Sequence, residues 1–159
     1  MKKIFIIILI ILLIILLGGC FMYIKNRPKK INNIEGIKSF YYFYTVGYHY
    51  EASIVYEIEC DDKCTLKIKP EGVTIEDASI YEIDKDVVEK LKDILNKYRV
   101  GRWNGFDGND RNVLDGNSFE LSVKMNNGDE VYARGYMKWP RNYQDVKKEI
   151  IDLFNQYEW

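Results

Sequence analysis

Histidine and cysteine, two residue types that commonly take part in catalysis, are few in this sequence of 159 residues. His49 is the single histidine, and Glu51 follows it at a spacing that places both on one face of a strand. Such a pair can transfer protons near neutral pH. The sequence identifies no Ser or Cys nucleophile beside it, so we interpret His49 as a solvated strand residue and predict no catalytic residue.

A loop rich in Asp, Asn and Gly is the second candidate for chemistry. It spans residues 103–112 and includes Asp107 and Asp110, with Asp115 just beyond it. Loop carboxylates of this kind can serve a hydrolase or bind calcium. Counting from Asp107, however, the sixth and twelfth positions hold Asn and Ser, where an EF-hand requires Gly and an acidic residue. We therefore attribute the composition to turn formation and predict neither a metal nor a cofactor.

Two of the three cysteines, Cys60 and Cys64, are separated by three residues and flanked by short strand-like runs. A tight hairpin would place their sulfur atoms opposite each other, so we predict a disulfide, which is typical of an oxidising exterior. Its stabilising effect is expected to be small because the closed loop is short. A zinc site is disfavoured, since two thiols and the distant His49 are fewer than four ligands. The spacing also disfavours a CxxC redox site.

Four aromatic residues are candidates for binding. Residues 40–44 are all aromatic, and strand alternation places Tyr41 and Phe43 on the opposite face from the other three. One interpretation is an exposed surface for a glycan or a protein partner; the other, which we favour, is that helices or a linker cover it. Trp103 lies in the Asp-rich loop, and Trp139 precedes a proline near the last helix. For both tryptophans we favour packing over binding.

The N-terminus carries a membrane-targeting signal. Lys2 and Lys3 precede residues 4–24, which contain no charged side chain and are long enough to span a bilayer as a helix. Three alternatives follow: an uncleaved transmembrane anchor, a lipoprotein signal and a cleaved secretory signal. Residues 17–20, Leu-Gly-Gly-Cys, resemble the bacterial lipobox, in which the cysteine, here Cys20, becomes lipidated. Because the residues after Cys20 remain apolar, we favour the uncleaved anchor, with the rest of the chain exported.

Charge is distributed unevenly along the chain, although the formal net charge is only −1. Residues 25–38 begin with a basic, proline-containing stretch and indicate a linker. Residues 31–159 hold 17 Lys and Arg against 24 Asp and Glu, a net charge of −7. An acidic domain argues against nucleic acid as a partner. We predict membrane lipids as the partner of the N-terminal segment, residues 1–24.

Residues 39–159 show the patterns of one folded domain. Apolar and polar residues alternate over residues 39–46, 48–60, 65–69 and, less regularly, 73–83. If Cys60 lies opposite Cys64 in a hairpin, Ile58 pairs with Leu66 and Glu57 pairs with Lys67. Apolar then meets apolar and charge meets opposite charge, which is what a correct register requires.

Two helices and a second hairpin complete the pattern. Asp84 can cap a helix whose apolar stripe runs from Val87 to Tyr98, and residues 142–157 carry a similar stripe. Between them, residues 118–125 and 130–135 flank an Asn-Gly turn. We predict an α+β fold: an N-terminal transmembrane helix, then an antiparallel sheet of about five to six strands with two helices packed on one face.

The second half of the chain also contains a series of turn, glycine and aromatic motifs: Trp103-Asn104-Gly105-Phe106, Asp115–Leu121, Asn127-Gly128-Asp129, Ala133–Tyr136 and Pro140–Tyr143. In this order they resemble uncharacterised bacterial membrane-anchored or lipoprotein-like domains of unknown function. The resemblance covers roughly residues 85–155. It implies a bacterial source and an envelope location, and it carries no catalytic residue to transfer.

The sequence therefore predicts an extracytoplasmic domain, tethered to the bacterial cell membrane, that works by binding an envelope protein or glycan without catalysis. One alternative is an envelope hydrolase or ion-dependent enzyme that uses the carboxylates near Asp107, Asp110 and Asp115, together with His49. Another is an immunity-type or inhibitory protein, which composition alone does not separate from the first.

Overall fold

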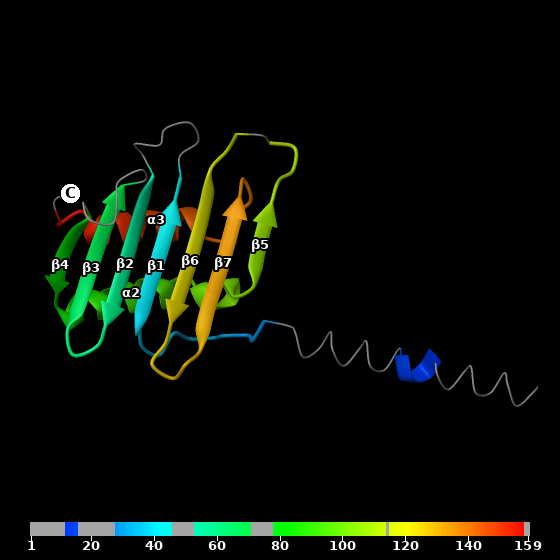
Figure 1. Cartoon of the computed structure of the whole chain (residues 1–159), viewed down its shortest axis with the longest axis horizontal. Helices are drawn as coiled ribbons and strands as arrows, with labels where there is room; N and C mark the ends of the chain where they lie inside the picture. The colour runs from blue at the N-terminus through cyan, green and yellow to red at the C-terminus, as the bar shows by residue number, and fades with distance from the viewer. Residues whose placement is uncertain (1–11, 16–27, 46–52, 71–77, 114, 158–159) are drawn as a thin grey trace, which may run out of the picture.

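A computed structural model describes residues 12–15, 28–45, 53–70, 78–113 and 115–157 (Figure 1). Its centre is a seven-stranded sheet in the order β4-β3-β2-β1-β6-β7-β5. The strands are β1 (Ser39–Tyr44), β2 (Ile54–Cys60), β3 (Cys64–Pro70), β4 (Ser79–Ile83), β5 (Phe106–Asn109), β6 (Ser118–Lys124) and β7 (Glu130–Tyr136). The helices are α2 (Lys85–Lys97), the short 3₁₀ helix η3 (Val100–Trp103) and α3 (Tyr143–Phe154).

The predicted fold class was wrong in the strand count and in the sheet type. The sheet has seven strands, and it is mixed because β5 pairs with β7 in parallel. No helix in the described residues is both long and apolar enough to cross a membrane. Of the range 4–24, where a spanning helix was predicted, the structure describes only residues 12–15, which are helical.

The missed strand, β5, has the composition of a turn, Phe-Asp-Gly-Asn, and it forms because of its neighbour in the sheet. Gly108 lies directly opposite Gly135 of β7. The carbonyl oxygen of Lys138 would lie 2.2 Å from a Cβ atom on Gly135 and 3.0 Å from one on Gly108, so a side chain at either position would be crowded. This close packing depends on tertiary structure, so the alternation of apolar and polar residues along the sequence does not predict β5.

The register predicted for the first hairpin is confirmed. β2 and β3 pair Cys60 with Cys64, Ile58 with Leu66 and Glu57 with Lys67. The apolar members of these pairs are buried, whereas Lys67 forms an ion pair with Glu57 at 3.3 Å. The alternation therefore sets one buried and one polar face, as a strand with a single covered face requires.

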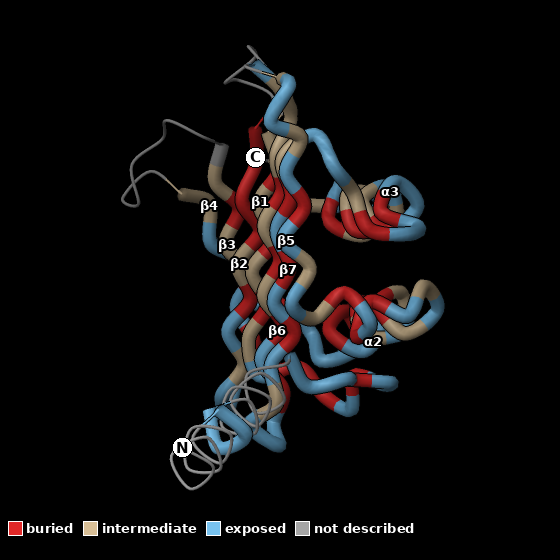
Figure 2. Tube along the Cα trace, turned by 90° about the vertical axis from the view of Figure 1, so that its right-hand side faces the viewer, coloured by how far each residue is buried: buried red, intermediate tan, exposed pale blue. Residues whose placement is uncertain are grey.

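Helices α2 and α3 lie on the same side of the sheet (Figure 2). Each has an apolar stripe facing the core: α2 buries Val87, Val88, Leu91 and Leu95, and α3 buries Tyr143, Val146, Ile150 and Phe154. Asp84 occupies the predicted N-cap position of α2, but its side chain makes no capping hydrogen bond. Tertiary burial therefore stabilises α2 more than its cap does.

Residues 28–38, part of the range assigned above to a linker, pack against the domain and cross beneath β1, β6 and β7 (Figure 1). Ile31, Ile34 and Ile37 are buried in the core, with 5%, 1% and 5% of their surface exposed. The side-chain amide of Asn96 bonds both backbone groups of Ile34: its oxygen accepts from the N–H at 2.8 Å, and its nitrogen donates to the carbonyl at 2.9 Å. The segment thus belongs to the folded domain.

Candidate functional site

A cavity of about 560 Å³ lies where the end of α2, η3 and the loop before α3 meet. We call it the basic pocket, because four cationic residues line it: Lys97, Arg99, Arg102 and Arg141. Its other lining residues are Tyr98, Trp103, Phe106, Trp139, Pro140 and Asn142. Among these described lining residues none is acidic, so the cavity concentrates positive charge on a domain that is acidic as a whole.

The four cations differ in whether an acid neutralises them. Lys97 forms an ion pair with Glu149 at 2.6 Å; this contact raises the pKa of Lys97 and lowers that of Glu149. Within the part of the chain that the structure describes, Arg99, Arg102 and Arg141 form no ion pair. Three guanidinium groups are thus left with charge and donors for a ligand.

Aromatic rings form the inner wall of the pocket and hold it in shape. Trp103 is buried, and its indole N–H donates to the carbonyl oxygen of Arg141 at 3.2 Å. Trp139 stacks on Tyr143 with ring centroids 4.6 Å apart and planes at 14°. Phe119 lies below, 4.6 Å from the Tyr143 ring. The indole bond ties η3 to the loop before α3, so the two walls are connected directly.

Two residues of the pocket have left-handed backbone conformations. Arg99 has φ 57° and Asn142 has φ 64°, and both line the cavity. A left-handed conformation costs a residue with a Cβ about 1–2 kcal/mol, less for Asn. Backbone hydrogen bonds stabilise the turn at Arg99. Its N–H donates to the backbone carbonyl of Asn96 at 3.0 Å, and its own carbonyl accepts from the N–H of Arg102 at 2.9 Å. Backbone strain of this kind is often retained at functional sites.

The structure brings two of the four predicted aromatic binding residues together. Trp103 and Trp139 both line the basic pocket. Tyr41 and Phe43 lie on the opposite sheet face, because their neighbours Phe40, Tyr42 and Tyr44 on the same strand are buried beneath the helices. The predicted residues therefore fall into two groups on different faces of the molecule.

The sheet face that carries Tyr41 presents further aromatic surface. Ser122 pairs with Tyr41 on one side and with Tyr132 on the other, so a small side chain separates the two tyrosines. Tyr132 is 37% exposed. Burial, followed by the nearby carboxylates of Glu120 and Glu57, raises the pKa of Tyr41. This hydroxyl therefore stays protonated at neutral pH.

The loop carboxylates do not form a metal-binding set in the described residues. Asp107 lies on β5 and pairs with Arg134 at 2.8 Å, a contact that lowers the pKa of this carboxyl group. The carboxylate of Asp110 accepts the N–H of Asn112 at 3.0 Å, which is the turn chemistry expected from the sequence. Among the residues described, no group of three or more His, Cys, Asp or Glu side chains is placed to hold a metal ion. His49, like Cys20, lies outside them.

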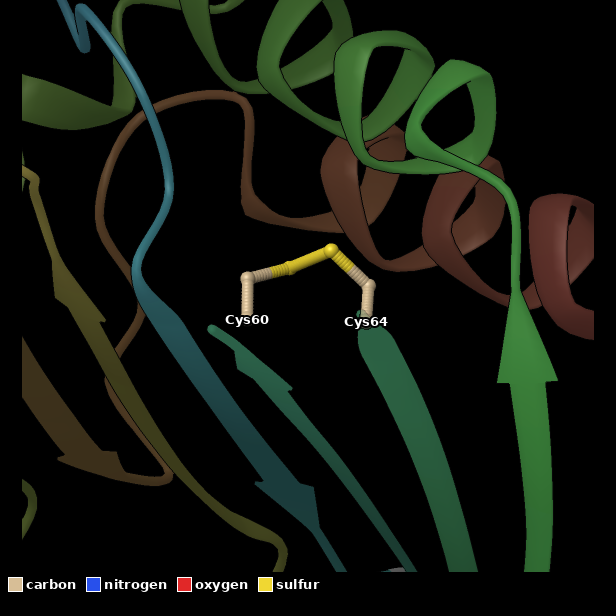
Figure 3. Close-up of a disulfide and its surroundings, with 2 residues drawn as sticks. All are labelled: Cys60 and Cys64. Carbon is tan, nitrogen blue, oxygen red and sulfur yellow. A yellow bond between two sulfur atoms is a disulfide. The ribbon is translucent and has the colours of Figure 1, made fainter. Parts of the chain in front are cut away.

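Cys60 and Cys64 are joined by a disulfide at the end of the β2–β3 hairpin (Figure 3). The S–S distance is 2.08 Å, and the two Cα atoms are 4.2 Å apart. Cys64 is buried and pairs on its other side with Ile83, the last residue of β4 before the start of α2. The bridge therefore closes the hairpin next to the point where the chain leaves the sheet for α2.

Replacing both cysteines, Cys60→Ser with Cys64→Ser, is expected to lower the free energy of unfolding by about 2 kcal/mol, because a loop this short restricts the unfolded chain only modestly. Urea denaturation of the wild type and the double variant measures the difference. A reducing agent should move the wild-type midpoint to that of the variant and leave the variant unchanged. A reductant-insensitive wild type would show that the purified protein holds free thiols.

Sequence patterns did not identify the basic residues of the pocket as candidate site residues. Arg99 directly precedes η3 and Arg102 lies within it, whereas Arg141 follows about forty residues later in the chain. A local signal exists, since Arg102 precedes Trp103 and Arg141 closely follows Trp139. Only the fold, however, shows that these two Arg and Trp pairs face one cavity.

No known family model matches this chain, and no curated protein matches it at a significant level. Inferences about function therefore rest on the residues and on the geometry described above.

Proposed function

We propose that this chain is a non-catalytic binding domain of the bacterial cell envelope, and that it recognises an anionic group in the basic pocket. The observation that carries the proposal is the clustering of Arg99, Arg102 and Arg141 around one cavity without an acidic residue in its described lining. Arginine binds carboxylate and phosphate groups through two parallel hydrogen bonds. Three such groups favour a ligand with several anionic oxygens.

The make-up of the pocket supports binding over catalysis. Its described lining contains no His, Asp, Glu, Cys or Ser. These residue types supply most general acids, bases and nucleophiles that work near neutral pH. The pocket instead offers cationic donors and aromatic faces, which hold a ligand and fix its orientation.

The envelope location is supported by the N-terminal sequence and the cysteines. Residues 4–24 are uncharged and apolar, and we propose that they attach the domain to the membrane, with lipidation of Cys20 as one route. A disulfide between Cys60 and Cys64 suits an oxidising compartment, which favours placing the domain on the extracytoplasmic side.

Binding of pyrophosphate to the full chain in detergent tests the proposed function. Replacing one arginine removes charge-assisted hydrogen bonds, so we expect about a tenfold loss of affinity each for Arg102→Gln and Arg141→Gln, and about a hundredfold loss for the double variant. Isothermal titration calorimetry at low and high salt measures this, and affinity should fall as salt rises.

Arg111→Gln is the matched control, because Arg111 is exposed and is not among the residues that line the pocket. It removes the same charge from the same half of the chain and should leave pyrophosphate affinity unchanged. Equal losses for Arg111→Gln and Arg102→Gln would mean that net charge alone drives the binding, and the proposed pocket would then be rejected.

A further inference from the structure

Residues 28–31 pack behind one wall of the basic pocket. Gly105 lies between the lining residues Trp103 and Phe106, and a Cβ atom on it would fall 2.1 Å from Cγ of Pro28. One turn earlier, a Cβ on Gly101 would fall 2.7 Å from the carbonyl oxygen of Ile31. The side-chain amide of Asn104 donates to the backbone carbonyl of Lys29 at 2.9 Å. Residues 28–31 are therefore packed against η3, the element that supplies Arg102.

Chain length places this wall close to the attachment point. The uncharged stretch ends at residue 24, four residues before Pro28. Even a fully extended chain covers only about 14 Å over four residues. If residues 4–24 attach the domain to a membrane, the basic pocket lies beside the layer of lipid headgroups. The turn between β6 and β7 lies at the same end of the domain, because Lys29 forms an ion pair with Asp129 at 2.6 Å.

The charge of the domain gives the pocket an orienting role at such a surface. Residues 31–159 carry a net charge of −7, so an anionic membrane repels most of the domain. The guanidinium groups of Arg99, Arg102 and Arg141 instead gather positive charge at one cavity, and Lys30, next to the Lys29 carbonyl that Asn104 bonds, is exposed. Tryptophan and arginine are also the side chains that suit the polar boundary of a bilayer.

We infer that the basic pocket binds the phosphate headgroup of an anionic phospholipid in the membrane to which the N-terminal segment attaches, an inference that rests on the proposed function. The phosphate oxygens accept hydrogen bonds from Arg102 and Arg141, and the aromatic wall that includes Trp139 contacts the glycerol portion. Binding holds the domain with its pocket side against the bilayer, so that the rest of its surface faces outward.

The test uses the full chain reconstituted into phosphatidylcholine vesicles with and without phosphatidylglycerol. Both pocket tryptophans report on the site, and Trp159→Phe removes the third tryptophan from the signal. We expect the tryptophan emission to change as phosphatidylglycerol increases. The double variant Arg102→Gln with Arg141→Gln should require at least about tenfold more of this lipid for the same change, and Arg111→Gln should match the parent.

A second arm of the experiment separates lipid from soluble phosphate. Glycerol 3-phosphate is added to the chain in vesicles of phosphatidylcholine alone. A response to glycerol 3-phosphate without any response to phosphatidylglycerol would overturn the headgroup inference and leave the anion-binding function standing. If the chain responds neither to phosphatidylglycerol nor to glycerol 3-phosphate and also does not bind pyrophosphate, the proposed function is overturned as well. A phosphatidylglycerol response that survives in the double arginine variant would also reject the inference.

Discussion

A chain shortened to begin at Ser39, where the sequence pattern places the start of the domain, is expected to lose about 6 kcal/mol of stability relative to one that begins at Pro28. The shortening removes Ile31, Ile34 and Ile37, and burial of each isoleucine contributes about 2 kcal/mol. It also leaves the Asn96 amide without the two backbone partners that it has in Ile34. Domains of this size have total stabilities of about 5–15 kcal/mol, so the shortened chain should be largely unfolded.

Urea denaturation followed by circular dichroism checks this expectation on the two shortened chains. A second variant, Asn96→Ala in the full chain, isolates the polar contacts and should cost about 2 kcal/mol, because it leaves the partly buried Ile34 backbone groups without those partners. Equal unfolding midpoints for the chains beginning at Pro28 and Ser39 would contradict the packing of residues 28–38 described here.

Local patterns predicted those parts of the fold in which neighbouring residues determine the outcome. The register of the β2–β3 hairpin follows from alternation on both sides of a short turn, and pairing Glu57 with Lys67 selects it. Helix α2 follows from an apolar stripe of four residues at helical spacing. The hairpin partners lie close in sequence, and the helical spacing of the α2 stripe is itself a local feature, although the stripe packs into a core shared with distant segments. In both cases the local pattern agrees with the packing.

The parts that sequence patterns missed depend on contacts between distant segments. Residues 28–38 were assigned to a linker because the range 25–38 begins with a basic, proline-containing stretch. Their contacts are with distant segments: Ile34 bonds Asn96 of α2, and Ile31 lies against Gly101 of η3. β5 needs the glycine of β7 opposite its own. The basic pocket brings together Arg102 and Arg141, which lie about forty residues apart in the sequence. Neither the alternation of apolar residues nor the composition of a segment indicates which distant segments will be in contact.

Sequence patterns therefore identified the tryptophans of the candidate pocket and missed its arginines. Trp103 and Trp139 were identified as candidates, but packing was favoured over binding for each, and the arginines beside them were not considered. In the structure each tryptophan packs and also lines the cavity: Trp103 is buried and bonded to the loop before α3, and Trp139 stacks on Tyr143. An amphipathic ring can anchor a wall on one side and face a ligand on the other.

Phe119→Ala is expected to cost about 4 kcal/mol of stability, since it removes a ring from a closely packed core and leaves a cavity. Phe119 is 2% exposed and contacts the four rings that surround the pocket wall: Tyr143 at 4.6 Å, Trp139 at 5.6 Å, and Trp103 and Phe106 at 6.3 Å. Its loss should also loosen Trp139 and weaken pyrophosphate binding, because the wall that orients the arginines is no longer held.

Phe154→Ala is the control that separates the two effects. Phe154 is fully buried in the same core, but its ring partner is Tyr56, at 5.0 Å, and it does not line the pocket. Both variants should lose similar stability in urea denaturation, whereas only Phe119→Ala should lower pyrophosphate affinity in conditions where both remain folded. Equal affinities for the two would mean that the pocket wall holds its shape without Phe119, and that the arginines are positioned by η3 and its bond from Trp103 to Arg141 alone.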